Sequence, residues 1–310
     1  MVLKNNKSVI VITGPTGIGK TGLSIELAQK LNCPIISADS RQIFKELKIG
    51  TAAPTDEELQ KANHYLIGTH SIFDYYSAYE YEQEALALAN QLFEKNDVVI
   101  LTGGSMMYID AFCNGIDELP TIDPELRNSL QETFRKEGLE SIRRQLKLLD
   151  PDFYNQVDLK NPKRVIHALE ICLMTGRPYS SLRTSTKKNR PFSMVKIGLD
   201  MERSQLHQRI NQRVDQMIQN GLENEAKGLF AHKTLNSLNT VGYREFFDFF
   251  DNKISREKTI ELIKRNSRRY ARKQLSWFRR NKEITWFSPQ NTEEVITFVK
   301  KRITQTGAQY

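Results

Sequence analysis

Hydrophobic residues near the start of the chain form two patterns that predict a strand followed by a helix. Val9 to Ile12 are four consecutive apolar residues, typical of a strand buried on both faces of a parallel sheet. Apolar residues then recur with helical spacing over residues 22–31. Further strands are expected within residues 33–42, 64–68, 97–105 and 194–200, separated by helical segments. The pattern therefore predicts an α/β fold, with a parallel sheet flanked by helices.

Strand signals stop at about Leu119, and a charged helical stretch follows. Helices are expected over Glu125–Glu137, Leu139–Leu149 and Pro162–Thr175. A polar, basic linker over residues 184–190 leads back to the next strand. We therefore expect an α-helical insertion domain at 119–189, inside a core made of residues 1–118 and 190–310.

The net charge of +8 over 310 residues favours a polyanionic partner or substrate. The three cysteines (Cys33, Cys113 and Cys172) are widely spaced, which argues against a disulfide framework or a zinc site. Reduced cysteines suit a cytoplasmic protein. No membrane span or signal peptide is expected, and a monomer is the default expectation.

The loop between the first strand and the first helix fits the phosphate-loop pattern G-x-x-x-x-G-K-[ST]. Glycines let its backbone amides turn inward beside the helix N-terminus, which makes a site for an anion. The motif predicts pyrophosphate or nucleotide binding, with Lys20 supplying charge and the Thr21 hydroxyl placed to ligate Mg2+. The alternative is a glycine-rich turn that binds nothing. The residues of the motif are Gly14, Pro15, Thr16, Gly17, Ile18, Gly19, Lys20 and Thr21.

Asp39 follows the second predicted strand, so it is expected beside the phosphate loop at the carboxyl edge of the sheet. A general base or a metal ligand could act there, and Arg41 and Gln42 could reach a substrate from the same edge. The alternative is that Asp39 or Ser40 caps a following helix. The position at the end of a strand favours catalysis.

A second strand leads into the glycine turn Thr102-Gly103-Gly104-Ser105. A Walker B strand would end in an acid, and here the acid, Asp97, stands at the start of the strand. The usual metal and water machinery of a nucleotide hydrolase is therefore not visible. The two glycines permit a close backbone approach to a ligand, and Ser105 offers a hydroxyl.

Two basic segments follow in the second half of the chain. Arg209 and Arg213 are four residues apart on one predicted helix face, which is either a solvated surface or a clamp on a leaving phosphate. Residues 264–282 contain nine Lys or Arg and no acid, with Tyr270 and two other aromatic residues between them. A basic, aromatic helix face favours nucleic-acid binding over a merely solvated surface, which would normally mix charge signs.

Several blocks together resemble the bacterial tRNA dimethylallyltransferases (tRNA isopentenyltransferases) over essentially the whole chain. The matching blocks are GPTGIGKT at 14–21, ISADSRQIF at 36–44, GTAAP at 50–54, GGSMMYI at 103–109, NPKRVIHALE at 161–170, QRINQRVDQMIQNGLENE at 208–225, VGYREF at 241–246 and YARKQLSWFRR at 270–280. The DSRQ block and the ARKQLSWFR block are the most specific. Ser105-Met106-Met107 and His167 differ from the residues that are usual in the family.

The resemblance implies transfer of a dimethylallyl group from dimethylallyl pyrophosphate to the exocyclic amine of adenosine 37, beside the anticodon of tRNA. It implies a P-loop fold whose loop holds pyrophosphate with Mg2+. Asp39 would be the general base, Arg213 would neutralise the departing pyrophosphate in preference to Arg209, and Ser105 would complete the catalytic set. The insertion would be a mobile domain that closes on the anticodon arm.

The resemblance also implies which residues contact the tRNA. Asp39, Ser40, Arg41, Gln42 and Ser105 would do so at the site, Arg127, Lys163 and Arg164 on the insertion, and Arg272, Lys273 and Gln274 on the basic helix.

Two other functions stay open from the residues alone. One is a small-molecule P-loop kinase with a helical lid, which leaves the basic segment at 264–282 unexplained. The other is a nucleotide-gated RNA-binding module without chemistry, for which loss of the Asp39 carboxylate would leave function intact.

Overall fold

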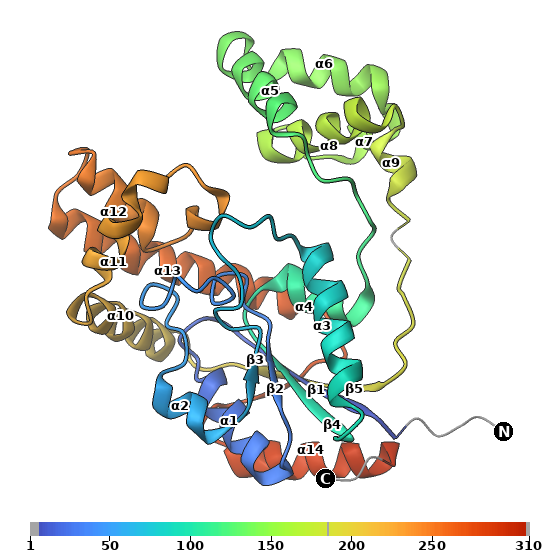
Figure 1. Ribbon diagram of the computed structural model, residues 1–310, viewed down its shortest axis with the longest axis vertical. Helices are drawn as coiled ribbons and strands as arrows, with labels where there is room; N and C mark the ends of the chain where they lie inside the picture. Colours follow the sequence, from blue (N-terminus) through green and yellow to red (C-terminus); the bar gives the residue numbers. More distant parts are fainter. Residues whose placement is uncertain (1–5, 185, 308–310) are drawn as a thin grey trace. The chain divides into compact units, whose positions relative to one another are not determined.

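The structure is a computed structural model that describes residues 6–184 and 186–307, and it contains an open sheet of six parallel strands (Figure 1). The strand order is β3-β2-β4-β1-β5-β6, and every neighbouring pair is parallel. The predicted α/β fold is confirmed. The strands are β1 (Ser8–Thr13), β2 (Ile35–Ser37), β3 (His64–Tyr65), β4 (Val98–Thr102), β5 (Ser193–Leu199) and β6 (Thr285–Phe287).

The apolar run of β1 is continuous because helices cover both faces of the sheet. Val9 and Val11 lie in one hydrophobic core with residues of α3, α4, α12 and α13, whereas Ile10 and Ile12 lie in a second core with residues of α1 and α14. The helices of this part of the chain are α1 (Lys20–Leu31), α2 (Asp56–Lys61), α3 (Ala78–Leu92), α4 (Met106–Asn114), α10 (Arg203–Gln219), α11 (Leu222–Leu229), α12 (Tyr243–Phe250), α13 (Arg256–Phe278) and α14 (Thr292–Thr306), with 3-10 turns η1 (Phe230–His232) and η2 (Asn236–Leu238).

The chain divides into two compact units, one made of Met1–Asn114 with Asn189–Tyr310 and the other of Gly115–Lys188. The sequence placed the start of the insertion at 119 and its end at 189. The second unit has its own hydrophobic core, which includes Ile142, Leu146 and Leu169. Its helices are α5 (Pro124–Glu137), α6 (Leu139–Leu149), α7 (Pro151–Gln156), α8 (Pro162–Thr175) and α9 (Tyr179–Leu182).

Element boundaries differ from the sequence prediction where side chains cap the backbone. In helix α3, Ser77 and Glu80 form a capping box that starts the helix at Ala78. Helix α7 was not predicted, although Asp150 caps it and Pro151 is its first residue. Strand β6 is only three residues long and was also missed.

The carboxyl ends of β2, β4 and β1 lie side by side, because these strands are neighbours in the sheet. The phosphate loop, the segment that carries Asp39, and the Gly103-Gly104 turn follow these three strands. The topology therefore brings three separate predicted motifs to one edge of the sheet.

None of the helices within residues 6–184 and 186–307 has both the length and the apolar character needed to cross a bilayer. Cys33, Cys113 and Cys172 are buried free thiols.

Candidate active site

The phosphate loop joins β1 to α1 and lines a cavity of about 1240 Å3. Gly14 has φ +144°, and a Cβ atom there would lie 2.9 Å from the Leu199 carbonyl oxygen, so a side chain does not fit. Gly19, with φ +109°, immediately precedes α1, so the free N–H groups of the first helical turn begin at the loop. The Ile18 side chain is buried in the hydrophobic core, so Ile18 offers a ligand only its backbone.

Lys20 folds back over the loop. Its ammonium group donates to the carbonyl oxygens of Gly14, at 3.0 Å, and Pro15, at 2.9 Å. The pKa of Lys20 is lowered to about 7, mainly by burial and also by the nearby Arg213 guanidinium, while Asp39 partly opposes both effects. An anion bound in the loop would favour the charged form, so the binding of a phosphate ligand would promote protonation of Lys20.

Two arginines from α10 reach the loop. Arg213 Nη1 donates to the Thr16 hydroxyl at 3.2 Å, and Nη2 donates to the Thr51 carbonyl oxygen at 3.2 Å. Arg209 Nε donates to the Gly17 carbonyl oxygen at 3.0 Å. The solvated-surface alternative does not describe Arg213, whose side chain is partly buried between the loop and Thr51, whereas Arg209 is exposed and contacts the loop from the surface. Only Arg213 ties the loop to the opposite wall of the cavity.

Asp39 lies half-buried just after β2 and lines the same cavity as Lys20, Arg213 and Tyr270. Its Oδ1 accepts from the backbone N–H of Arg41, at 2.9 Å, and of Gln42, at 3.3 Å. Oδ2 accepts no hydrogen bond from any residue in the described ranges. Oδ1 therefore caps a turn, where the alternative expected a helix, because no helix follows β2 before α2.

Ser105 does not face the ligand space freely. It is buried, its hydroxyl accepts from the Ser40 N–H at 2.7 Å, and it donates to the Ser40 hydroxyl at 3.0 Å. A Cβ atom at Gly103 would lie 2.1 Å from the Ala38 carbonyl oxygen. Gly103 therefore permits close packing between the ends of β2 and β4, where the sequence suggested approach to a ligand.

The side chains of Arg41 and Gln42 are used within the protein. Arg41 Nη1 donates to the Ser237 carbonyl oxygen at 2.9 Å. Gln42 Nε2 donates to the carbonyl oxygens of Thr51 and Ala52, both at 3.1 Å. Gln42 thus joins two segments of the cavity wall, whereas Arg41 and Ser237 do not line the cavity.

Glu225 was not identified from the sequence. Its carboxylate accepts from the backbone N–H groups of Lys48, Ile49 and Gly50, at 2.8–3.1 Å, and from the Tyr243 hydroxyl at 2.6 Å. The segment so held continues into Thr51 and lines the cavity opposite the phosphate loop. No local signal marks this carboxylate, because its backbone partners lie 175–177 residues away and Tyr243 lies 18 residues away.

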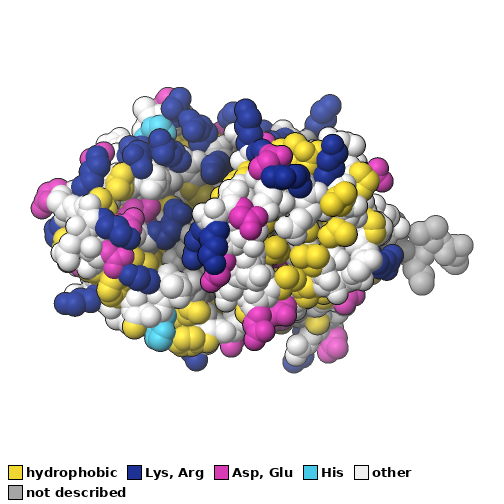
Figure 2. Space-filling model, turned by 90° about the horizontal axis from the view of Figure 1, so that it is seen from above, with side chains coloured by type: hydrophobic (Ala, Val, Ile, Leu, Met, Phe, Trp, Pro, Cys, Tyr) yellow, Lys and Arg dark blue, Asp and Glu magenta, His cyan; other side chains and the backbone are white. Residues whose placement is uncertain are grey.

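The basic helix α13 presents different side chains to different surroundings. Arg272 and Lys273 are exposed and make no ion pair or hydrogen bond with any residue in the described ranges, as a tRNA-binding role requires. Lys264 pairs with Asp215 at 2.6 Å, so part of the basic segment is neutralised by another helix. Figure 2 shows many Lys and Arg side chains on the face that it presents, with fewer Asp and Glu among them. Gln274 is buried and points toward the phosphate loop instead of solvent.

The second unit carries three predicted tRNA-binding residues. Lys163 and Arg164 are exposed in the first turn of α8. Arg127 makes a two-point contact with the buried Glu170, through Nε at 2.8 Å and Nη2 at 2.9 Å. Burial would raise the pKa of Glu170, but hydrogen bonds from Arg127 and His167 lower it overall. Arg127 therefore has a structural partner in this unit.

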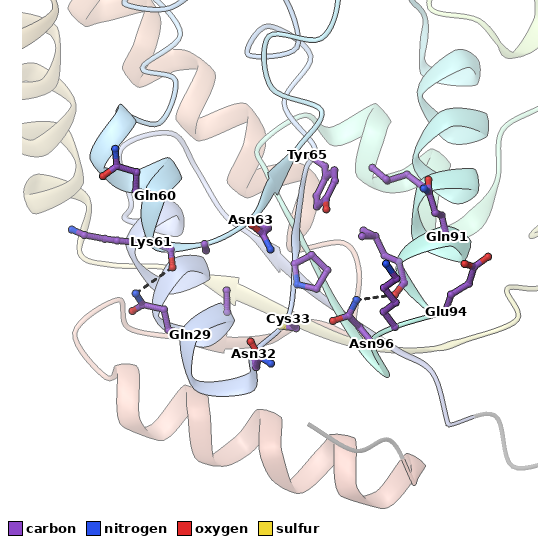
Figure 3. A pocket seen from close by; sticks show the side chains of 16 residues that line it. Gln29, Asn32, Cys33, Gln60, Lys61, Asn63, Tyr65, Gln91, Glu94 and Asn96 are labelled. Atoms are coloured by element: carbon purple, nitrogen blue, oxygen red, sulfur yellow. Dashed lines mark hydrogen bonds between the residues drawn. The ribbon is translucent and has the colours of Figure 1, made fainter.

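A second cavity, of about 790 Å3, lies where β2, β3 and β4 begin (Figure 3). Two of the side-chain amides labelled there donate to backbone carbonyl oxygens: Gln29 to that of Lys61, and Asn96 to that of Leu92. Burial raises the pKa of Cys33 to about 12, so its thiol stays protonated. This cavity lies at the amino ends of the strands and lacks the loop, the arginines and the carboxylate of the first one.

The comparisons with known proteins agree with this geometry. The protein family described as IPP transferase matches residues 42–281. A protein named tRNA dimethylallyltransferase 1 from Bacteroides fragilis is 54% identical over 297 residues, which cover 96% of this chain and 99% of the relative. This chain belongs to the tRNA dimethylallyltransferase family.

Other members and solved structures are similar over nearly the same length. The tRNA dimethylallyltransferase 1 of Porphyromonas gingivalis is 56% identical over 293 residues, covering 94% of this chain and 98% of that protein. The crystal structure of the tRNA isopentenylpyrophosphate transferase from Bacillus halodurans has a TM-score of 0.72 and 33% identity, covering 97% of this chain and 98% of that one. A eukaryotic dimethylallyltransferase acting on tRNA has a TM-score of 0.78 at 24% identity, covering 96% and 80%, and shares the fold.

Proposed function

We propose that this chain transfers the dimethylallyl group of dimethylallyl pyrophosphate to N6 of adenosine 37, next to the anticodon of tRNA, and releases pyrophosphate. The observation that carries the proposal is that Asp39 lines the same cavity as a complete phosphate loop. In this arrangement the carboxylate can accept a proton from the attacking amine, and the anion site can hold the pyrophosphate that leaves the allylic carbon.

The phosphate loop is the proposed pyrophosphate site. Negative charge grows on the leaving pyrophosphate as the allylic C–O bond breaks, so donors aimed at that charge stabilise the transition state. Loop amides, the Lys20 ammonium and the Arg213 guanidinium are the donors that this chain offers. Arg213 already contacts Thr16 in the loop, so it needs little rearrangement to meet the anion.

Asp39 is the proposed general base. Its Oδ1 is held by two backbone N–H groups, which fixes the carboxyl plane and leaves Oδ2 to accept a proton from the exocyclic amine. The target base must leave its stack to reach the cavity. Ser105 is proposed to position the general base, Asp39. Its hydroxyl holds the backbone N–H of Ser40, the residue after Asp39.

Mg2+ is the proposed cofactor. Within residues 6–184 and 186–307 there is no cluster of three or more His, Cys, Asp or Glu side chains for a metal ion. The residues nevertheless fit Mg2+, which is typically held by few protein oxygens together with substrate phosphates and water. The Thr21 hydroxyl lines the cavity without a hydrogen-bond partner in those ranges and would be the protein ligand. When bound, Mg2+ would neutralise charge on the pyrophosphate.

Exposed cations on each unit are proposed to bind tRNA: Arg272 and Lys273 on α13 of the first unit, and Lys163 and Arg164 on α8 of the second. A monomer is the proposed form. The three free thiols suit the cytoplasm as the proposed location.

A small-molecule kinase is less well supported. Strand β4 ends in Thr102, followed by Gly103-Gly104-Ser105, so no carboxylate stands where a phosphoryl-transfer enzyme would hold its metal ion. An RNA-binding module without chemistry leaves the free oxygen of Asp39 without a role.

The deciding experiment combines unmodified tRNA, dimethylallyl pyrophosphate and Mg2+ with the protein, and identifies the nucleosides by mass spectrometry. We expect one five-carbon unit on the adenosine next to the anticodon. Asp39→Asn keeps an oxygen that can accept from Arg41 and Gln42 but removes the base, so it should abolish the product while tRNA still binds. A folded protein that forms no adduct on competent tRNA would contradict the proposal, and ATP consumption with a metabolite panel would then test the kinase.

A further inference from the structure

One buried amide joins three segments of the site that are far apart in sequence. Gln274 of α13 is 1% exposed. Its Oε1 accepts from the backbone N–H of Thr16 in the phosphate loop, at 2.9 Å. Its Nε2 donates to the carbonyl oxygen of Gly104, in the turn after β4, at 2.8 Å. The amide thus spans the space between the loop and the neighbouring turn.

This space is closely fitted to the amide. A Cβ atom at Gly104 would lie 2.4 Å from Gln274 Nε2 and 3.7 Å from the Lys20 ammonium nitrogen. Any residue with a side chain at position 104 would therefore push the amide away from the loop. The glycine permits the approach of Gln274, a contact that the sequence pattern did not indicate.

Thr16 is held from two sides as a result. Its N–H group is used by Gln274, and its hydroxyl accepts from Arg213 Nη1 at 3.2 Å. Backbone N–H groups are the means by which a phosphate loop binds anionic oxygens. At Thr16 that donor already has a partner from the protein, and the partner is a carbonyl oxygen, which repels an anionic oxygen.

We propose that Gln274 is a specificity-determining residue that limits the loop to two phosphoryl groups. The inference rests on the proposed function and concerns the choice of donor. Beyond its two phosphoryl groups, dimethylallyl pyrophosphate presents an uncharged carbon chain, which needs no N–H donor. A nucleoside triphosphate presents a third phosphoryl group, which must displace the amide to reach the Thr16 N–H.

The cost of that displacement falls on the triphosphate alone. Pushing the amide aside leaves the buried Gln274 without its two partners, and unpaired buried polar groups are strongly unfavourable. Selectivity is a difference between two affinities, so a penalty on one ligand is as effective as an added contact for the other. A loop with an otherwise complete nucleotide-binding motif can in this way prefer a pyrophosphate.

The test measures binding of inorganic pyrophosphate and inorganic tripolyphosphate, each with Mg2+, to the full chain without tRNA by titration calorimetry. We expect wild type to bind pyrophosphate more tightly by about tenfold or more, the order expected when a buried polar group loses its partner. In Gln274→Ala the tripolyphosphate affinity should rise by about tenfold. The pyrophosphate affinity should change far less, because pyrophosphate does not need the Thr16 donor.

Gln216→Ala is the matched control. Gln216 lines the same cavity, and its amide bonds with Asn220 instead of the loop, so the preference should stay as in wild type. Circular dichroism and thermal melting would establish that the variants fold. If Gln274→Ala does not fold, wild type still decides, because equal affinity for the two anions overturns the proposal. An unchanged preference in a folded Gln274→Ala overturns it as well.

The readout is independent of prenyl transfer. Failure of the proposed function would appear as missing adduct on tRNA, whereas failure of this inference would appear in the preference between two anions.

Discussion

The Ser105 hydroxyl accepts a 2.7 Å hydrogen bond from the backbone N–H of Ser40, the residue that follows Asp39. Ser105→Ala removes the acceptor and leaves that N–H unpaired, which costs about 1–3 kcal/mol where water cannot replace it. The segment that carries the carboxylate should then be less well fixed. We expect kcat to fall by about tenfold or more with little change in tRNA affinity.

Ser105→Thr is the control for this prediction because it keeps the hydroxyl. It should retain most of the rate, and single-turnover kinetics would measure the difference. Equal rates for Ser105→Ala and wild type would show that the Ser40 contact does not position the base.

Lys20 should make pyrophosphate binding depend on pH. The pKa of Lys20 is lowered to about 7 in the folded protein, from the ordinary 10.5. The free enzyme therefore holds a neutral lysine above pH 7, and a bound anion favours the charged form. Between pH 7 and 10, binding should take up a proton, and affinity should fall as pH rises. Calorimetry in buffers of different ionisation enthalpy measures the uptake.

The control for the pH effect is Lys20→Arg, since an arginine keeps its charge throughout this range. The difference between the two proteins removes the contribution of pyrophosphate's own titration.

The same lysine should also affect stability. Between pH 7 and 10.5 the unfolded chain holds the extra proton, so the free energy of unfolding should rise with pH over this window. Proton uptake that is identical in both proteins would contradict the assignment.

Arg213→Lys tests the role of the guanidinium group in stabilising the leaving pyrophosphate. The two nitrogens of Arg213 reach Thr16 and Thr51 at the same time, which a lysine ammonium cannot do. We expect a loss of about 10²-fold in kcat, the scale of one transition-state donor. Arg209→Lys should lose less, since Arg209 has a single contact with the loop, to Gly17. Rapid-quench measurements on both variants give the comparison.

The double variant Arg272→Ala with Lys273→Ala tests the proposed tRNA surface. Both side chains are exposed and have no partner in the described ranges, so their removal should weaken tRNA binding and flatten its dependence on salt. The KM for dimethylallyl pyrophosphate should not change. Lys264→Ala is the matched control on the same helix, because its charge is already paired with Asp215 at 2.6 Å. Filter binding over a salt series would separate the two outcomes.

The sequence predicted those parts of the site whose signals are local. The phosphate loop follows from eight consecutive residues, and Asp39 from its place at the end of a short strand. The role of Gln274 could not be predicted, since Thr16 is 258 residues away and the residue lies within a basic segment that suggested a solvent-facing role. The use of Arg127 by Glu170 was missed for a similar reason, because the partners lie 43 residues apart on different helices.

Helices and strands were also predicted where the signal is local and missed where it comes from distant contacts. Helices α6 and α8 were predicted to the residue, because Gly138 and Asn161 mark their starts and strong periodicity fills them. Strand β6 was missed because three residues carry too little pattern, and it exists through pairing with β5.

The carboxylate of Glu225 occupies three convergent backbone N–H groups at residues 48–50, an arrangement that would otherwise attract an anionic ligand. That segment of the cavity wall is therefore ordered by the protein's own charge before any substrate arrives. The conformational entropy of this segment is lost when the protein folds, so substrate binding does not have to order it again. Binding energy from the donor and the tRNA is then available for the transition state instead of for shaping the wall.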